Sequence, residues 1–175
     1  LNDISENMFP SEIQPFAAAA ELLNGLRGEG GQCYIIGNGG SASIAAHVSV
    51  DFCKIARIPT RTFNESNFLT CVSNDYGYER VFEVGIDWFA NPNDLVIAIS
   101  SSGESENIIK AVSFAKTKGL RTISFSGFGD TNRLRQLAHI NFWVDSSDYN
   151  TVEMIHHIWL VRLGDVLSKM NNDEG

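Results

Sequence analysis

The chain has 175 residues, enough for one domain with a sizeable hydrophobic core. Its hydrophobic content of 43% with 15 glycines is typical of a globular protein and excludes disordered and fibrous classes. The net charge is -8 and the 13 basic residues are scattered, which argues against a nucleic-acid or lipid partner. No apolar run approaches the roughly 20 residues that span a membrane. Residues 1–10 lack a signal-peptide pattern, so we expect a cytoplasmic protein.

Helix and strand patterns alternate along the chain. The strand patterns are mostly apolar throughout, which is typical of strands covered by helices on both faces. The alternation therefore predicts one α/β domain over residues 1–175, with a parallel sheet between two layers of helices. In chain order we expect a helix at 11–27, a strand at 32–36, a helix at 41–53, a linker or edge strand at 56–63, helices at 66–73 and 78–90, a strand at 94–99, a helix at 105–118, a strand at 121–126, a helix at 130–137, a strand at 140–144 and a helix at 151–170.

The three cysteines are an odd number with no C-x-x-C spacing. Cys33 lies in a strand pattern and Cys71 in an apolar patch, while Cys53 ends a helix pattern. This distribution predicts buried, reduced thiols and no disulfide framework.

Two polar loops each follow an apolar strand and precede a helix. The first runs from Gly37 to Ser41, and the second from Ser100 to Ser105. Backbone N–H groups and hydroxyls at a helix N-terminus favour an anion, and the phosphate of a small molecule suits such a site. Neither loop has the lysine of a P-loop or the glycine spacing of a dinucleotide fingerprint. Both leave the carboxyl edge of the sheet, so one cleft could hold both; the alternative is a pair of ordinary strand-to-helix turns.

Together with His47 and the segment Ser73-Asn74-Asp75, these loops resemble the SIS (sugar isomerase) domain family and, within it, the phosphoheptose isomerase subgroup. The resemblance covers residues 10–168. It implies a flavodoxin-like parallel sheet and a homotetramer with active sites between subunits. It also implies conversion of sedoheptulose 7-phosphate to D-glycero-D-manno-heptose 7-phosphate, in the biosynthesis of bacterial lipopolysaccharide.

The helices at 11–27 and 151–170 carry more apolar residues than one face of a sheet needs. With the implied homotetramer, this excess predicts a helical bundle between chains. The alternative is that both helices only complete the core of one chain.

The resemblance also implies which residues form the site. Asp51 would be the base, and His47 a metal ligand or electrophile. A zinc site would comprise His47, Asp51 and Glu153. The substrate-binding residues would be Asn38, Gly39, Gly40, Ser41, Asp75, Ser100, Ser101, Ser102, Ser105 and Glu153.

Three positions depart from the family pattern. Asp51 stands where the family has a glutamate, Asn150 where it has an aspartate, and Val161 where it has a histidine. The shorter carboxylate can misplace a base by about 1 Å, which can cost ~10²-fold in rate. Valine transfers no proton, so the second acid–base group of the family is missing from its position.

His156 and His157 are nearby candidates for the missing group. His157 lies four residues after Glu153, so the two share a helical face as paired metal ligands would. They could rebuild a site with His47 and Asp51. The alternative is that one histidine is packed and the other solvated on an amphipathic helix.

These observations favour an isomerase that moves a proton between neighbouring carbons of a sugar phosphate through an enediol. The rival class is a non-catalytic SIS protein, either a sugar-phosphate-binding protein or a factor associated with the bacterial replication initiator. Such a protein would keep the phosphate loops and relax the acid–base residues, as the departures do. Turnover of a sugar phosphate discriminates the two.

Overall fold

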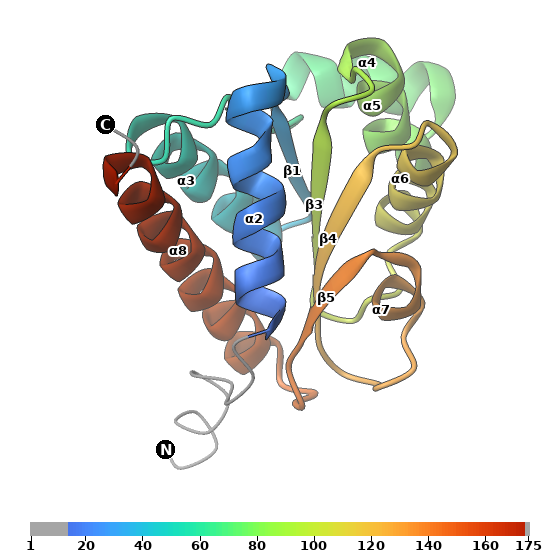
Figure 1. Ribbon diagram of the computed structural model, residues 1–175. Coiled ribbons are helices and arrows are strands. Elements are labelled where there is room, and N and C mark those ends of the chain that lie inside the picture. Colours follow the sequence, from blue (N-terminus) through green and yellow to red (C-terminus); the bar gives the residue numbers. More distant parts are fainter. Residues whose placement is uncertain (1–13, 174–175) are drawn as a thin grey trace.

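The computed structural model describes residues 14–173 and shows a central sheet between two layers of helices (Figure 1). Within these residues the sheet has five strands, all parallel, in the order β2-β1-β3-β4-β5. This confirms the predicted fold class. The strands are β1 (Cys33–Gly37), β2 (Thr60–Arg61), β3 (Leu95–Ser100), β4 (Arg121–Ser126) and β5 (Ile140–Trp143).

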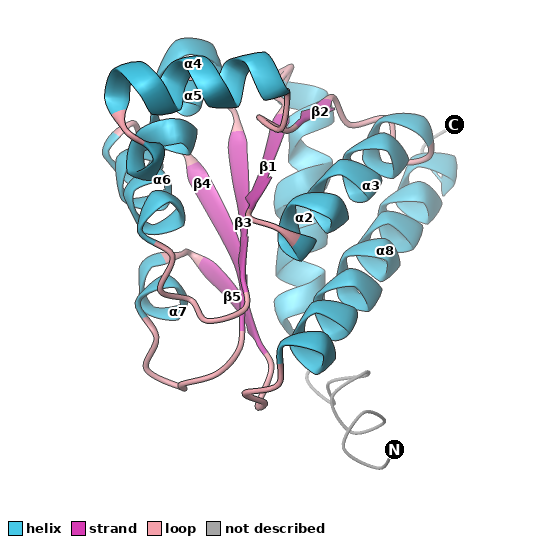
Figure 2. Ribbon diagram, turned by 180° about the vertical axis from the view of Figure 1, so that it is seen from behind, coloured by secondary structure: helices cyan, strands magenta, loops and turns pink. Residues whose placement is uncertain are grey.

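The helices form one layer on each face of the sheet (Figure 2). The side chains of β1 show why both layers are needed. Cys33 and Ile35 pack in one core cluster, and Tyr34 and Ile36 in the other, because successive strand residues point to opposite faces. One layer contains α2 (Gln14–Glu29), α3 (Gly40–Lys54) and α8 (Tyr149–Asp173); the other contains α4 (Ser66–Tyr76), the 3-10 turn η1 (Tyr78–Arg80), α5 (Val81–Phe89), α6 (Glu106–Thr117) and α7 (Arg133–Leu137).

Some predicted boundaries were wrong. Helix α4 continues through residues 74–76, where we expected a break after residue 73, and ends at Gly77, whose N–H donates to Ser73 O. Helix α7 begins only at Arg133, because the side chain of Asn132 caps it. The final helix begins at Tyr149 rather than at residue 151. Residues 11–13 of the first predicted helix lie outside the described residues.

The predicted burial of the thiols is correct only for Cys33. Cys53 and Cys71 are exposed, which corrects the expectation for both. Cys53 lies at the end of α3 beside the backbone of Thr60, and Cys71 lies on the outer face of α4. Both helices are amphipathic, and these positions belong to their solvent side.

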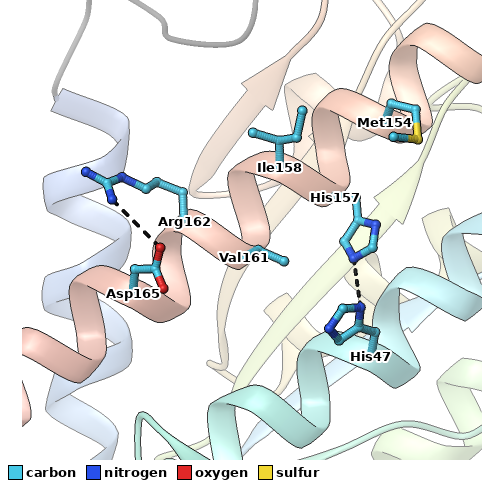
Figure 3. A pocket seen from close by; sticks show the side chains of 7 residues that line it. All are labelled: His47, Met154, His157, Ile158, Val161, Arg162 and Asp165. Atoms are coloured by element: carbon cyan, nitrogen blue, oxygen red, sulfur yellow. Dashed lines mark hydrogen bonds and ion pairs between the residues drawn. The ribbon is translucent and has the colours of Figure 1, made fainter.

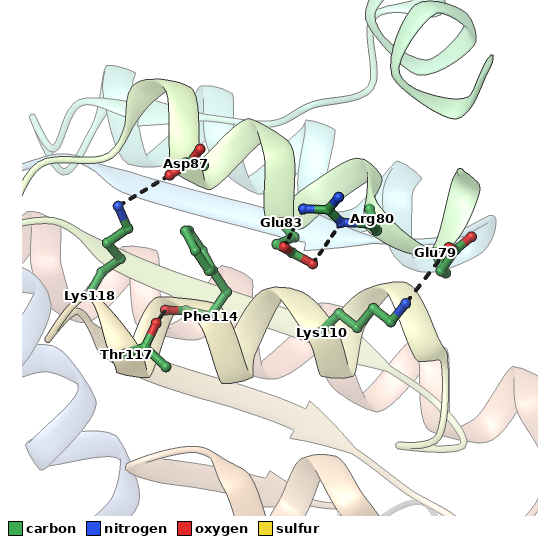
Figure 4. A network of polar contacts seen from close by, with 8 residues as sticks. All are labelled: Glu79, Arg80, Glu83, Asp87, Lys110, Phe114, Thr117 and Lys118. Carbon is green, nitrogen blue, oxygen red and sulfur yellow. Dashed lines mark hydrogen bonds and ion pairs between the residues drawn. The ribbon is translucent and has the colours of Figure 1, made fainter. Parts of the chain in front are cut away.

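Exposed ion pairs join α6 to the segment that precedes it (Figure 4). Lys118 Nζ lies 3.2 Å from Asp87 of α5, and Lys110 Nζ lies 3.7 Å from Glu79 of η1. Such pairs contribute only about 0–1 kcal/mol each in solvent. Their role is therefore to set where η1 and α5 lie along α6 rather than to provide much stability.

None of the helices within residues 14–173 combines the length and the apolar character that crossing a lipid bilayer requires.

His156 of α8 is completely buried, and its Nε2 donates to Ser126 O at 3.1 Å. Burial lowers its pKa to about 4, although the hydrogen bond to Ser126 acts in the opposite direction. The unfolded chain therefore binds a proton between about pH 6.5 and pH 4 that the folded chain does not. Stability from this group is present above this window and is lost as the pH falls through it.

We expect the free energy of unfolding to fall by about 3 kcal/mol across this window because of His156, at about 1.36 kcal/mol per pKa unit. Urea titrations at stepped pH values measure the slope. His156→Gln keeps an N–H donor near Ser126 but does not titrate, so its slope should be smaller. Parallel slopes in the two proteins would contradict the assignment.

Candidate functional site

The two predicted loops line one cavity of about 290 Å³ at the carboxyl ends of β1 and β3. The loops leave neighbouring strands, and each leads directly into a helix. The sheet therefore brings together residues that are about sixty positions apart in the sequence. The lining residues are Asn38, Gly39, Gly40, Ser41, Ile99, Ser100, Ser101, Ser102, Ser105, Tyr149 and Glu153.

The glycine loop brings backbone to the cavity. Gly39 has φ 54° and precedes α3, and no side chain caps this helix. The first N–H groups of α3 therefore have no partner within the helix and can meet an anion. At Gly40 the carboxylate of Glu153 lies where a Cβ atom would stand, so a larger residue there would have to displace the end of that side chain.

The serine loop adds hydroxyl groups. The hydroxyls of Ser100 and Ser105 lie 3.2 Å apart, and Ser102 Oγ accepts the N–H of Glu104 at 3.2 Å. Accepting that bond leaves the Ser102 hydroxyl proton free to donate. The N-cap residue Ser105 makes no side-chain cap on α6, so a second helix N-terminus is also open to a ligand.

The attraction that this cavity can offer an anion comes from dipoles rather than from cationic side chains. Of the described residues that line it, none is lysine, arginine or histidine, and Glu153 is the one carboxylate among them. An anion bound here would be held by amide N–H groups, hydroxyls and two helix N-termini.

A second cavity of about 390 Å³ lies along α8 beside α3 (Figure 3). The side chains of His47 and His157 meet at its edge, with His157 Nε2 2.9 Å from His47 Nδ1. On its other side, His47 Nε2 lies 3.2 Å from Asp51 Oδ2. The structure thus places His157 against His47, which in turn contacts Asp51, while Glu153 lies at the other cavity. The lining residues are His47, Met154, His157, Ile158, Val161, Arg162 and Asp165.

These contacts set the hydrogen-bond roles of a neutral His47. An ionised Asp51 only accepts hydrogen bonds, so a neutral His47 carries its proton on Nε2 and its Nδ1 accepts. His157 must then donate from Nε2, which leaves the lone pair on its Nδ1. Burial, followed by the charge of His47, lowers the pKa of His157, while Asp51 raises it. The arrangement favours a neutral His157 and a carboxylate that orients both rings.

The predicted zinc ligands do not form a metal cage in this arrangement. Both ring nitrogens of His47 are engaged, one with Asp51 and one with His157. Glu153 lies in the other cavity, against Gly40. Over residues 14–173 no three His, Cys, Asp or Glu side chains gather where they could hold a metal ion. His47, Asp51 and Glu153 are thus not gathered into one ligand set within the described residues of this chain, and a zinc site stays a prediction.

The structure leaves two predicted residues away from both cavities. His156 is completely buried and bonded to Ser126, so it is corrected from a catalytic candidate to a core residue. Asp75 is exposed on α4, where its carboxylate accepts the amide of Asn74 at 2.8 Å. It does not line the cavity of the serine loop.

Sequence reasoning missed three residues at the first cavity. Tyr149 begins α8 and lines the cavity, two residues before the predicted start of that helix. Asn107 and Tyr78 bond to Asn38 of the glycine loop. The only signal was the position of Asn107, two residues after the serine loop; nothing local marks Tyr78.

The fold and this cavity define an α/β protein of the doubly wound type, with a cleft at the carboxyl edge of its sheet whose N–H groups and hydroxyls suit an anion. The family model of the SIS domain matches residues 1–127. The chain belongs to the SIS domain family.

Similar proteins agree with this assignment. The chain is 31% identical over 176 residues to a phosphoheptose isomerase of Thermodesulfovibrio yellowstonii, covering 97% of this chain and 85% of that protein. It is 33% identical over 165 residues to a phosphoheptose isomerase of Geotalea daltonii, covering 90% and 85%. The structure of a phosphoheptose isomerase from Francisella tularensis superposes with a TM-score of 0.85 at 24% identity, covering 95% and 91%, which shows the shared fold.

Proposed function

We propose that the chain is a sugar-phosphate isomerase that interconverts an aldose and a ketose. The finer proposal is that it converts sedoheptulose 7-phosphate to D-glycero-D-manno-heptose 7-phosphate, for bacterial surface polysaccharide. The observation that carries the proposal is the position of the anion-binding cavity beside the cluster of His47, Asp51 and His157.

The spacing of the two parts suits a ligand with a phosphate at one end and a carbonyl at the other. Helix α3 begins at Gly40 in the cavity and reaches His47 about 10 Å further on, at about 1.5 Å per residue. Helix α8 passes from Glu153 to His157 over about 6 Å. Binding energy at the phosphate end can therefore hold the reacting carbons at the cluster.

The chemistry requires one proton to move between two carbons. A base takes the proton from the carbon next to the carbonyl, giving an enediol, and the proton returns to the former carbonyl carbon. A hydroxyl proton moves between the two oxygens in the same sense, from the oxygen of the carbon that loses its proton to the former carbonyl oxygen, so no other reactant is consumed. Asp51 and the imidazoles that it orients are the groups in this region that can accept and return protons.

The proposal is tested by incubating the protein with sedoheptulose 7-phosphate in D₂O. We expect an aldose product and deuterium on the carbon that receives the proton, both visible by NMR. Sedoheptulose without phosphate is the control and should react far more slowly, because it lacks the group that the cavity binds. Parallel reactions with added zinc and with a chelator test the metal. Binding without turnover would contradict the proposal and favour the sugar-phosphate-binding alternative.

A further inference from the structure

The side chain of Asn38 is committed to partners inside the protein. Its Nδ2 donates to Asn107 Oδ1 at 2.9 Å, and its Oδ1 accepts from Asn107 Nδ2 at 2.9 Å. Asn107 is 3% exposed and lies in the first turn of α6. This reciprocal amide pair joins the glycine loop to the helix that follows the serine loop, so it links the two halves of the cavity.

A third hydrogen bond uses the remaining acceptor site of Asn38 Oδ1. The hydroxyl of Tyr78 donates to Asn38 Oδ1 at 2.9 Å. An amide oxygen accepts two hydrogen bonds and an amide nitrogen donates two. The oxygen of Asn38 is therefore saturated, while one N–H remains free. A ligand in the cavity meets Asn38 only as a donor.

The backbone around Tyr78 is built to hold that hydroxyl in place. Gly77 has φ 89°, in the left-handed region that glycine adopts at little cost, and it turns the chain from α4 into η1. The next residue, Glu79, pairs with Lys110 of α6 at 3.7 Å (Figure 4). This contact places the turn that carries Tyr78 against α6, the helix that carries Asn107.

We infer that Tyr78 and Asn107 are positioning residues that fix the Asn38 carboxamide as an N–H donor to an oxygen of the bound sugar phosphate. The inference rests on the proposed function for the identity of the ligand. The positioning itself is a property of the free protein. It assigns Asn38 to a ligand oxygen that accepts a hydrogen bond, such as a phosphate, carbonyl or hydroxyl oxygen.

Calorimetry with sedoheptulose 7-phosphate tests the inference. Tyr78→Phe removes one hydroxyl and keeps the ring, and we expect it to raise Kd about 3- to 10-fold, the usual effect of one neutral hydrogen bond. In an Asn38→Ala background the same change should have no effect. Asn107→Leu removes both amide bonds to Asn38 without adding a charge beside the phosphate, and it should also raise Kd only when Asn38 is present.

Tyr76→Phe is the matched control. Tyr76 is 44% exposed on α4 and its ring lies against Trp88, so removing its hydroxyl should leave Kd unchanged. Tyr78 is itself 56% exposed, so the unfolding midpoint of Tyr78→Phe should match that of the wild type. An unchanged Kd in Tyr78→Phe, or an equal loss in the Asn38→Ala background, would overturn the inference.

A measurement without ligand separates this inference from the proposed function. In the ¹⁵N-labelled full chain, the carboxamide resonances of Asn38 should shift and their protons should exchange faster in Tyr78→Phe, and Tyr76→Phe should leave them unchanged. If no sugar phosphate binds the wild type, the proposed function fails, whereas the NMR result still decides the positioning. Unperturbed Asn38 resonances in Tyr78→Phe would overturn it.

Discussion

Asp51→Asn is expected to lower kcat by about 10²–10⁴-fold, the range that general acid–base groups supply. Asp51 Oδ2 lies 3.2 Å from His47 Nε2, and an amide at this position neither accepts a proton nor stabilises a charged imidazole. Affinity for the sugar phosphate should stay nearly unchanged, because Asp51 does not line the cavity of the two loops. Steady-state kinetics and calorimetry on one preparation measure both quantities.

Asp165→Asn is the control for this substitution. Asp165 lines the same cavity as His47 and His157. Its carboxylate pairs there with the exposed Arg162 of the same helix. It touches neither histidine of the cluster in the contacts described above, so its loss should leave kcat within about twofold, as for most surface changes. Full activity in Asp51→Asn would exclude Asp51 as base or orienting group and move the search to His157 and Glu153.

The second large effect is expected at the serine loop. Replacing Ser100 and Ser102 together by alanine should raise Kd for a sugar phosphate by about 10²–10⁴-fold. Each hydrogen bond to a charged group contributes roughly 1.5–3 kcal/mol, and about 1.4 kcal/mol is tenfold in affinity. The cavity wall contains no cation among the described residues, so nothing nearby compensates for the lost donors. Calorimetry with sedoheptulose 7-phosphate and with inorganic phosphate measures the loss.

The matched control removes two hydroxyls elsewhere. Ser49 of α3 bonds the carbonyl of Ala46 in its own helix, and Ser113 lies in α6 beyond the first turn. The Ser49→Ala, Ser113→Ala double variant should bind as the wild type does. Unchanged affinity in the Ser100→Ala, Ser102→Ala variant would mean that the serine loop is not the anion site.

The fold was predictable because its signals are local. Each inner strand is a short apolar run between turn residues, and each helix shows its own period. The break expected between residues 73 and 78 began too early in the sequence, for an instructive reason. Asn74 and Asp75 favour turns in isolation, yet α4 buries Val72 and continues until Gly77 ends it. Packing outweighed the local preference there.

The site was predictable only where a short motif carries it. Gly39, Gly40 and the serine loop are recognisable as anion-binding motifs from the sequence alone, and the sheet brings them to one cavity. The contact of His47 with His157 spans 110 positions and depends on how α8 crosses α3. Helical spacing predicted that Glu153 and His157 share one face of the helix. They lie one helical turn apart, and this distance puts Glu153 at the cavity of the two loops and His157 at the cavity along α8. The predicted zinc and the predicted tetramer stay predictions.

One edge of the sheet bears on how copies of this chain can meet. The edge strand β2 has only two residues, Thr60 and Arg61, and Pro59 directly before it has no N–H to offer. A further strand would find almost no ladder to extend there, and a short edge with a charged side chain and a proline discourages such pairing. A second copy of the chain therefore cannot extend the sheet at β2. Contact between two copies on that side has to use the surfaces of helices.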